Sequence, residues 1–271
     1  MRRLERLGIL LALVVVGLSL SAYVPLPSPV LSVRLPGSVS PVSITLTPAR
    51  QVSLAISLLA CVVIDSLMRA DPRLPDTGLG RTIPYWVLPV FVILSAFTAF
   101  ERLSGATQQV VGLVSVSALV ALLVVAQLYT LDPEGRWAQL ARLGLNAITY
   151  GMALASFITA YRLPGRAIVA PLTVAGAGLA LALPLLETTR APSGRVWAGA
   201  ILVGLMMAEV AWALNSGILS SLATGLVLLL VFYGVTGIVQ QHFWGRLSRQ
   251  VAVEFAVVAA VVIALIARFA A

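Results

Sequence analysis

Residues 109–131 read QVVGLVSVSALVALLVVAQLYTL and contain no charged side chain. A helix of about 20 apolar residues spans the hydrocarbon core of a bilayer, so this run is long enough to cross a membrane once. The whole chain has the same character: 60% of its 271 residues are hydrophobic, 10% are charged and the mean hydropathy is +1.02. An ordinary soluble domain is about 25% charged. The sequence therefore predicts an all-α integral membrane protein.

Eight further apolar runs accompany this one, and turn-forming residues such as Asp132-Pro133 and Leu163-Pro164-Gly165 separate several of them. The nine predicted spans are residues 7–24, 52–68, 84–100, 109–131, 138–160, 167–186, 196–214, 218–240 and 251–270. Most connections are short, so neighbouring helices are expected to be adjacent and antiparallel. We therefore expect residues 1–271 to form a single polytopic membrane domain, a bundle of about nine transmembrane helices.

The first run, residues 7–24, follows a basic N-terminal segment and has two interpretations. A signal peptide would be cleaved, whereas a signal anchor would remain as the first span. The motif Ser19-Leu20-Ser21 is a weak cleavage site, and the apolar stretch is long enough to span the membrane. These features favour the anchor, and the order of the later spans is the same in both cases.

The basic side chains predict which way the chain faces. All 18 are arginine, because the sequence contains no lysine, and the formal net charge is +8. Cytoplasmic loops are enriched in basic residues. With the N-terminus inside, twelve arginines are cytoplasmic and six are not; the outer six are Arg34, Arg50, Arg102, Arg162, Arg166 and Arg268. We therefore expect a cytoplasmic N-terminus and an extracytoplasmic C-terminus.

Residues 30–47, between the first two spans, follow a different pattern. Apolar and polar side chains alternate through Val33-Arg34-Leu35 and again through Val42-Ser43-Ile44-Thr45, which is typical of half-buried β-strands. Pro36-Gly37 lies between the two stretches and suits a turn. The pattern predicts a small extracytoplasmic β-hairpin whose apolar face rests on the helix ends or the membrane surface.

The sequence lacks the residue sets that intramembrane enzymes commonly use. Its single histidine, His242, excludes a His-Glu-x-x-His zinc motif, and His242 with the single cysteine Cys61 cannot form a structural zinc site. Paired acidic residues for a magnesium-bound pyrophosphate are also missing. We therefore expect no catalytic residue, no metal and no cofactor. Because the arginines are scattered between apolar runs, a nucleic-acid-binding face is not expected either.

Glu209 is the most unusual side chain, because ionisable residues inside a span are rare and are often functional. Counting from Val196, it lies about 20 Å into a hydrocarbon core that is about 30 Å thick. A carboxylate at that depth needs a proton or a hydrogen-bond partner. Tyr150 and Thr98 lie at similar depths in their own spans, so we predict an intramembrane polar cluster of Glu209, Tyr150 and Thr98. A structural role and a proton or ion relay both remain open for this cluster.

A second group of charged residues is expected at the cytoplasmic boundary. Asp65 lies four residues before Arg69, and this spacing favours a salt bridge on a helix. Long charged side chains near helix ends can also reach the headgroup region. The predicted inner-boundary charge layer consists of Asp65, Arg69, Arg142, Arg246, Arg249 and Glu254. Its arginines are suited to anionic lipid headgroups.

The run at residues 138–160 carries small side chains at every fourth position. These are Ala147, Gly151, Ala155 and Thr159, which would form one stripe along a helix. Small residues at this spacing let two helix backbones approach closely in a membrane. We therefore expect this helix to be central in the bundle, with Gly151 at a close contact.

Three stretches of the C-terminal third resemble a known family. They are Glu209-Val210-Ala211-Trp212-Ala213-Leu214-Asn215, Phe232-Tyr233-Gly234 and Gly245-Arg246-Leu247, which is followed by Glu254. The family that they resemble consists of bacterial multi-pass membrane proteins of unknown activity. The resemblance implies a bacterial cell membrane and assigns no functional residues.

Three classes of function are compatible with these observations. The leading interpretation is a non-enzymatic subunit or scaffold of a membrane assembly, which would bind the lipid bilayer and partner subunits. It is favoured by the short loops, the small-residue stripe and the missing catalytic residues. A transporter or lipid-handling protein that uses Glu209 is the alternative. An intramembrane enzyme of an unrecognised kind is the third.

Overall fold

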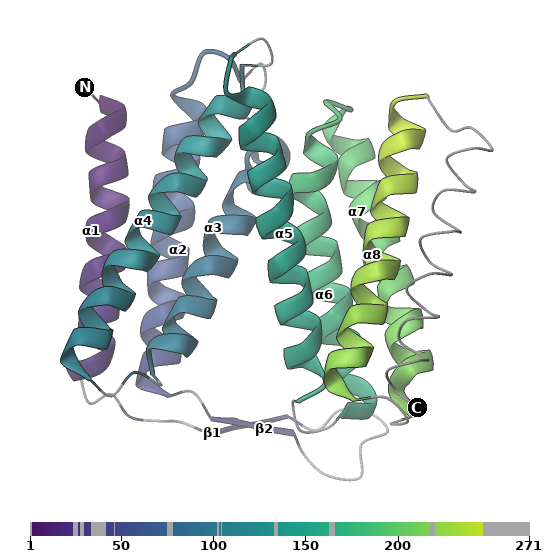
Figure 1. Ribbon diagram of the computed structural model, residues 1–271, viewed down its shortest axis with the longest axis horizontal. Coiled ribbons are helices and arrows are strands. Elements are labelled where there is room, and N and C mark those ends of the chain that lie inside the picture. Colours follow the sequence, from purple (N-terminus) through teal and green to yellow (C-terminus); the bar gives the residue numbers. More distant parts are fainter. Residues whose placement is uncertain are drawn as a thin grey trace. The chain divides into compact units, whose positions relative to one another are not determined.

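A computed structural model gives the fold of the chain, and it describes residues 2–23, 27, 30–33, 42–45, 47–74, 78–101, 103, 105–132, 135–162, 166–216 and 220–245. Long α-helices account for most of these residues (Figure 1). The helices are α1 (Arg2–Tyr23), α2 (Pro48–Arg69), α3 (Leu79–Phe100), α4 (Ala106–Thr130), α5 (Ala138–Ala160), α6 (Arg166–Glu187), α7 (Ser193–Ala213) and α8 (Ser221–Phe243). A short 3-10 helix, η1 (Leu214–Ser216), follows α7.

Seven of the described helices, α2 to α8, are long and apolar enough to cross a membrane. The chain is therefore a protein of membrane-embedded helices. The prediction of nine spans is not confirmed, because the described residues contain seven candidates. Most of the first predicted span lies in α1, which is not among the seven, and the ninth, residues 251–270, lies outside the described residues.

Two four-residue strands, β1 (Val30–Val33) and β2 (Val42–Thr45), pair in an antiparallel arrangement between α1 and α2. Val30 lies opposite Thr45, and Val33 lies opposite Val42. The expected turn at Pro36-Gly37 lies outside the described residues. A hairpin across this segment and its extracytoplasmic position therefore remain predictions.

The chain divides into two compact units, Met1–Leu145 and Asn146–Ala271, and the division falls within α5. In the first unit α2 packs between α1 and α3, and α4 contacts both α1 and α3. The apolar side chains at these contacts, among them Val14, Ile64, Ile93 and Leu123, are fully buried. Burial of these side chains between the helices fixes the arrangement of the first unit.

Local sequence explains where two of the helices begin. Thr47 precedes α2 with extended backbone angles, and its side chain accepts a hydrogen bond from the Arg50 amide at 3.3 Å. Pro48 then occupies the first helical position, where a missing N–H costs nothing. Ser220 caps α8 in the same way by accepting a hydrogen bond from the Ala223 amide. Both residues satisfy backbone donors that a helix start leaves without a partner.

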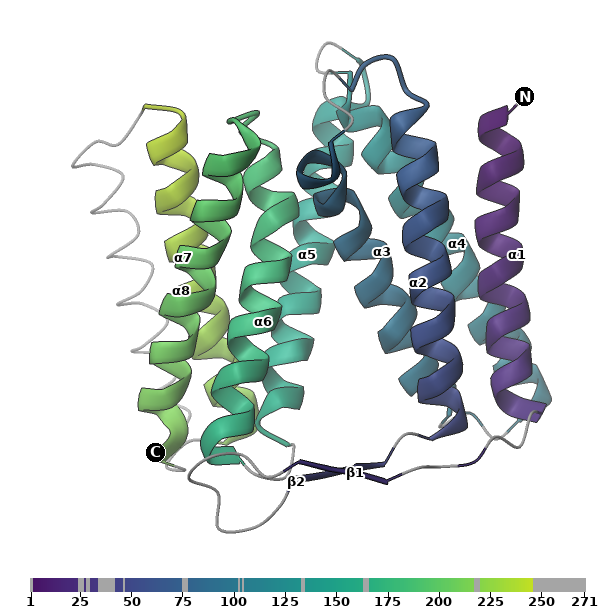
Figure 2. The same cartoon turned by 180° about the vertical axis from the view of Figure 1, so that it is seen from behind.

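In the second unit α6 and α7 make the most extensive helix–helix contact among the described elements, and Figure 2 shows them side by side. One face of α7 is buried at three- and four-residue intervals, which is the spacing of a helix face; its members are Val196, Gly199, Ala200, Val203, Gly204, Met207 and Ala211. A Cβ atom at Gly204 would lie 2.9 Å from the Leu179 Cβ and 3.1 Å from the Ala175 carbonyl oxygen. The two backbones approach closely because Gly204 has no side chain.

The expected close contact at Gly151 is not found among the described residues of the second unit. Gly151 lies on the exposed face of α5, and a Cβ atom there would meet nothing within 4 Å. A stripe of small residues permits close approach but does not choose the neighbouring helix. The close contact forms instead between α6 and α7, which are joined by a short connection.

Replacing Gly204 with leucine is expected to destabilise the protein by about 1–3 kcal/mol, because the new side chain must push α6 and α7 apart. Gly176 is the matched control: it also lies inside a helix, but a Cβ atom there would meet nothing within 4 Å. Thermal unfolding in a mild detergent measures both variants. Equal stability of Gly204→Leu and Gly176→Leu would contradict the close contact.

Candidate functional site

Glu209 lies on the exposed face of α7, together with exposed apolar residues such as Leu205 and Trp212. Its side chain forms no hydrogen bond or ion pair with the other described residues. The helix ends four residues later at Ala213, about 6 Å further along the axis. This end lies one residue before the end of the predicted span, residues 196–214, so the depth of Glu209 in the membrane stays a prediction.

Tyr150 lies between aromatic side chains of α8 in the second unit. Its ring packs edge-to-face against Phe232, with 5.9 Å between ring centroids, and against Tyr233, with 5.6 Å. Near these rings the Thr236 hydroxyl donates to the carbonyls of Phe232 at 2.6 Å and Tyr233 at 3.1 Å in its own helix. Thr236 is fully buried and was not identified from the sequence, although its position one turn after Phe232 places both on the same face of α8.

The described contacts do not join the predicted cluster of Glu209, Tyr150 and Thr98. Thr98 belongs to the first unit, and its hydroxyl donates a hydrogen bond to the Leu94 carbonyl of its own helix at 3.0 Å. The described contacts of Tyr150 are with the Phe232 and Tyr233 rings of α8. A shared role for the three residues therefore stays a prediction.

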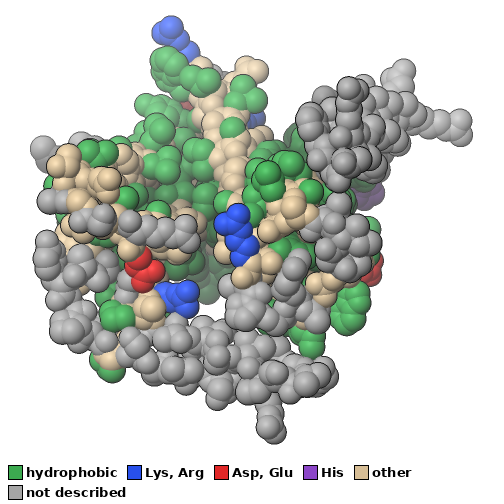
Figure 3. Space-filling model, turned by 60° about the horizontal axis from the view of Figure 1, so that its bottom comes forward, with side chains coloured by type: hydrophobic (Ala, Val, Ile, Leu, Met, Phe, Trp, Pro, Cys, Tyr) green, Lys and Arg blue, Asp and Glu red, His purple; other side chains and the backbone are tan. Residues whose placement is uncertain are grey.

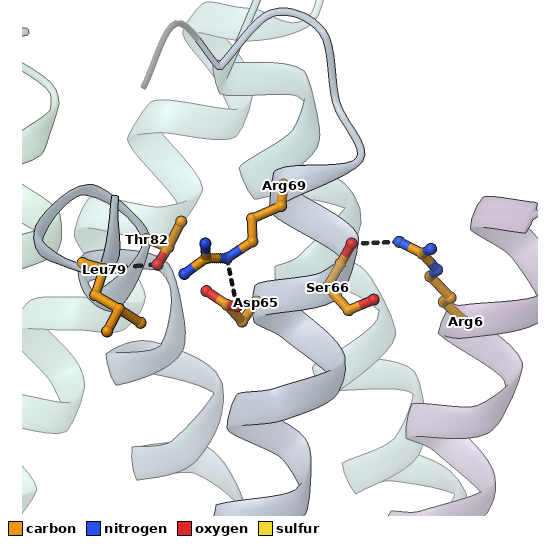
Figure 4. A network of polar contacts seen from close by, with 6 residues as sticks. All are labelled: Arg6, Asp65, Ser66, Arg69, Leu79 and Thr82. Atoms are coloured by element: carbon orange, nitrogen blue, oxygen red, sulfur yellow. Dashed lines mark hydrogen bonds and ion pairs between the residues drawn. The ribbon is translucent and has the colours of Figure 1, made fainter. Parts of the chain in front are cut away.

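Charged side chains gather where α2 ends. The Arg69 Nε donates to Asp65 Oδ2 at 2.6 Å, which is the ion pair that the four-residue spacing predicts (Figure 4). Arg6 of α1 donates a hydrogen bond to the backbone carbonyl of Ser66. Thr82 and Leu79, at the start of α3, lie on the side toward which the Arg69 side chain extends (Figure 4). The bond from Arg6 thus connects α1 to α2, while the Thr82 hydroxyl donates to the Leu79 carbonyl within α3.

Outside the predicted charge layer, Arg73 approaches Asp132 at 3.8 Å, but both side chains are largely exposed, and such pairs contribute little to stability. The remaining predicted members of the layer are Arg142, Arg246, Arg249 and Glu254. Arg142 lies near the start of α5 with a half-buried side chain. Arg246, Arg249 and Glu254 lie outside the described residues.

Three long side chains that the sequence did not single out bond to backbone carbonyls of neighbouring helices. Gln127 of α4 donates to the Tyr85 carbonyl of α3 at 3.0 Å, and Gln240 of α8 donates to the Leu185 carbonyl of α6 at 2.8 Å. The Tyr161 hydroxyl, which is buried, donates to the Ala211 carbonyl of α7 at 2.6 Å. A glutamine near the end of an otherwise apolar run was the available signal.

No group of three or more histidine, cysteine or acidic side chains that could hold a metal ion occurs within the part of the chain that the structure describes. Cys61 is a half-buried free thiol on α2, and the His242 ring lies 6.1 Å from the Phe243 ring at the end of α8. On the face drawn in Figure 3, few of the coloured side chains are charged.

One protein family matches almost the whole chain, from residue 26 to residue 269, and its description is "Protein of unknown function (DUF5656)". The chain belongs to this family. The match corrects the extent of the resemblance seen in the sequence, which was limited to the C-terminal third. No curated protein and no solved structure matches the chain.

Replacing Tyr161 with phenylalanine is expected to destabilise the protein by about 1–3 kcal/mol, because the buried Ala211 carbonyl then loses a hydrogen-bond donor. Tyr129→Phe is the control, since that side chain is exposed. Thermal unfolding in detergent gives the comparison. If the two variants are equally stable, the Tyr161 hydroxyl does not support α7.

Proposed function

We propose that this chain is a non-enzymatic subunit or scaffold of a membrane assembly. Its helices would hold a partner membrane protein through a helix face that is exposed in the second unit, residues 146–271. The observation that carries the proposal is the small-residue stripe of α5.

The stripe consists of Ala147, Gly151, Ala155 and Thr159, and all four residues are exposed. At the contact between α6 and α7, the two backbones approach closely because Gly204 has no side chain. Helix association in membranes relies on such close packing, since lipid tails are as apolar as the helix surfaces. An exposed stripe of the same kind supports binding of a helix from another protein.

The proposed setting is a bacterial inner membrane, with the N-terminus in the cytoplasm. The excess of arginines on one side supports this orientation. Arg69 and Arg73 would then face the cytoplasmic leaflet, where anionic lipid headgroups are the expected binding partners. The alternative of a transporter has less support, because no described hydrogen bond links Glu209 to Tyr150 or Thr98.

Replacing Gly151 with leucine is expected to abolish association while leaving the chain folded, because the new side chain blocks the stripe without meeting another part of the protein. Gly176→Leu is the control, since Gly176 is an exposed helical glycine outside the stripe. The measurement is the mass of the tagged protein after extraction and purification in mild detergent, together with its unfolding temperature.

The proposal expects wild type and Gly176→Leu to elute as an assembly and Gly151→Leu to elute as a monomer with an unchanged unfolding temperature. A wild-type monomer, or an assembly that survives Gly151→Leu, would contradict it.

A further inference from the structure

Helix α3 contains two prolines, Pro84 and Pro89, within a membrane-crossing segment. A proline has no backbone N–H, so Pro89 cannot bond to the carbonyl four residues earlier, which belongs to Tyr85. The ring of a proline also pushes against that carbonyl and bends the helix. The Tyr85 carbonyl therefore needs a donor from elsewhere, because an unpaired carbonyl in hydrocarbon is costly.

Gln127 of α4 supplies this donor. Its Nε2 lies 3.0 Å from the Tyr85 oxygen, and only 3% of the residue is exposed. Helices α3 and α4 are in direct contact, so the bond joins two packed helices. The position of Gln127 in an otherwise apolar run is explained by the proline on the neighbouring helix.

Within the described part of the chain, only the nitrogen of the Gln127 amide is hydrogen-bonded. The Gln127 Oε1 is buried and has no hydrogen-bond partner among the described residues. A buried acceptor without a donor reduces what the amide contributes to stability. Burial of this oxygen therefore offsets part of the free energy that the bond to Tyr85 contributes.

We propose that residues 79–88 of α3 form a hinged arm and that Gln127 is the latch that holds it. The hinge is Pro89, and the latch is the bond from Gln127 to Tyr85. This inference is independent of the proposed function.

The arm leads directly to the charged residues at the end of α2. It carries Leu79 and Thr82, which Figure 4 places beside the ion pair of Arg69 and Asp65. Release of the latch would move the start of α3 away from that pair. A hydrogen bond inside the membrane would thereby control the geometry of the polar network at its edge.

A double-mutant cycle tests the latch. Gln127→Met removes the donor but keeps the volume, so it should lower the unfolding temperature. Pro89→Ala restores the backbone N–H that can bond to Tyr85, so the same Gln127→Met change should then cost much less. An equal loss in both backgrounds would overturn the proposal.

The matched control is a second cycle with Gln240→Met and Pro184→Ala. Gln240 bonds to the Leu185 carbonyl, whereas Pro184 frees the carbonyl of Ala180 four residues earlier. These two changes should be independent. If Gln127→Met alone does not fold, recovery of folded protein in Gln127→Met with Pro89→Ala supports the latch, and failure to recover overturns it.

Spin labels measure the movement of the arm. Cysteines at Leu79 and Val62, both exposed, would carry the labels in a chain in which Cys61→Ser removes the native thiol. The distance between them should be narrowly distributed in wild type, broad in Gln127→Met and narrow again when Pro89→Ala is added. A distribution that Gln127→Met leaves unchanged would rule out the hinged arm.

Discussion

Every backbone carbonyl inside a membrane needs a hydrogen-bond donor from the protein, because no water is present to provide one. Helices meet this requirement along their length but not in their last turn or four residues before a proline. Four side-chain bonds to helix carbonyls fall at such places. Arg6 bonds to Ser66, Tyr161 to Ala211 and Gln240 to Leu185 in the last turn of a helix, and Gln127 bonds to Tyr85 before a proline. These four side chains thus lie where a backbone carbonyl lacks a donor within its own helix.

Packing between the helices follows a second rule. Since lipid and leucine are equally apolar, helices associate where small residues allow the backbones to approach. Gly204 meets this condition with a partner present, and the stripe that contains Gly151 meets it on an exposed face. The contact at Gly204 holds α6 against α7. The exposed stripe at Gly151 is the basis of the association with another protein that we propose.

Much of this architecture can be predicted from apolar runs alone, because a run of about 20 apolar residues is typical of a transmembrane helix. Residues 138–160 form α5 as predicted, and the four-residue spacing of Asp65 and Arg69 predicts their ion pair. The surroundings of Glu209 could not be predicted in this way. Most of α7 is apolar on all sides, so its hydropathy does not reveal which face is buried. The acceptor of Gln127 depends on a proline in another helix, which no local pattern connects to it.

The most direct test of this account is the state of the Tyr85 carbonyl. Tyr85-Trp86 is the only Tyr-Trp pair in the sequence, so carbonyl-13C tyrosine combined with 15N tryptophan isolates its signal by solid-state NMR in lipid bilayers. The account predicts the downfield 13C shift of a hydrogen-bonded carbonyl in wild type, an upfield change in Gln127→Met and no change in Gln240→Met. A Tyr85 shift that Gln127→Met leaves in place would contradict the account, because the carbonyl would then have a different donor.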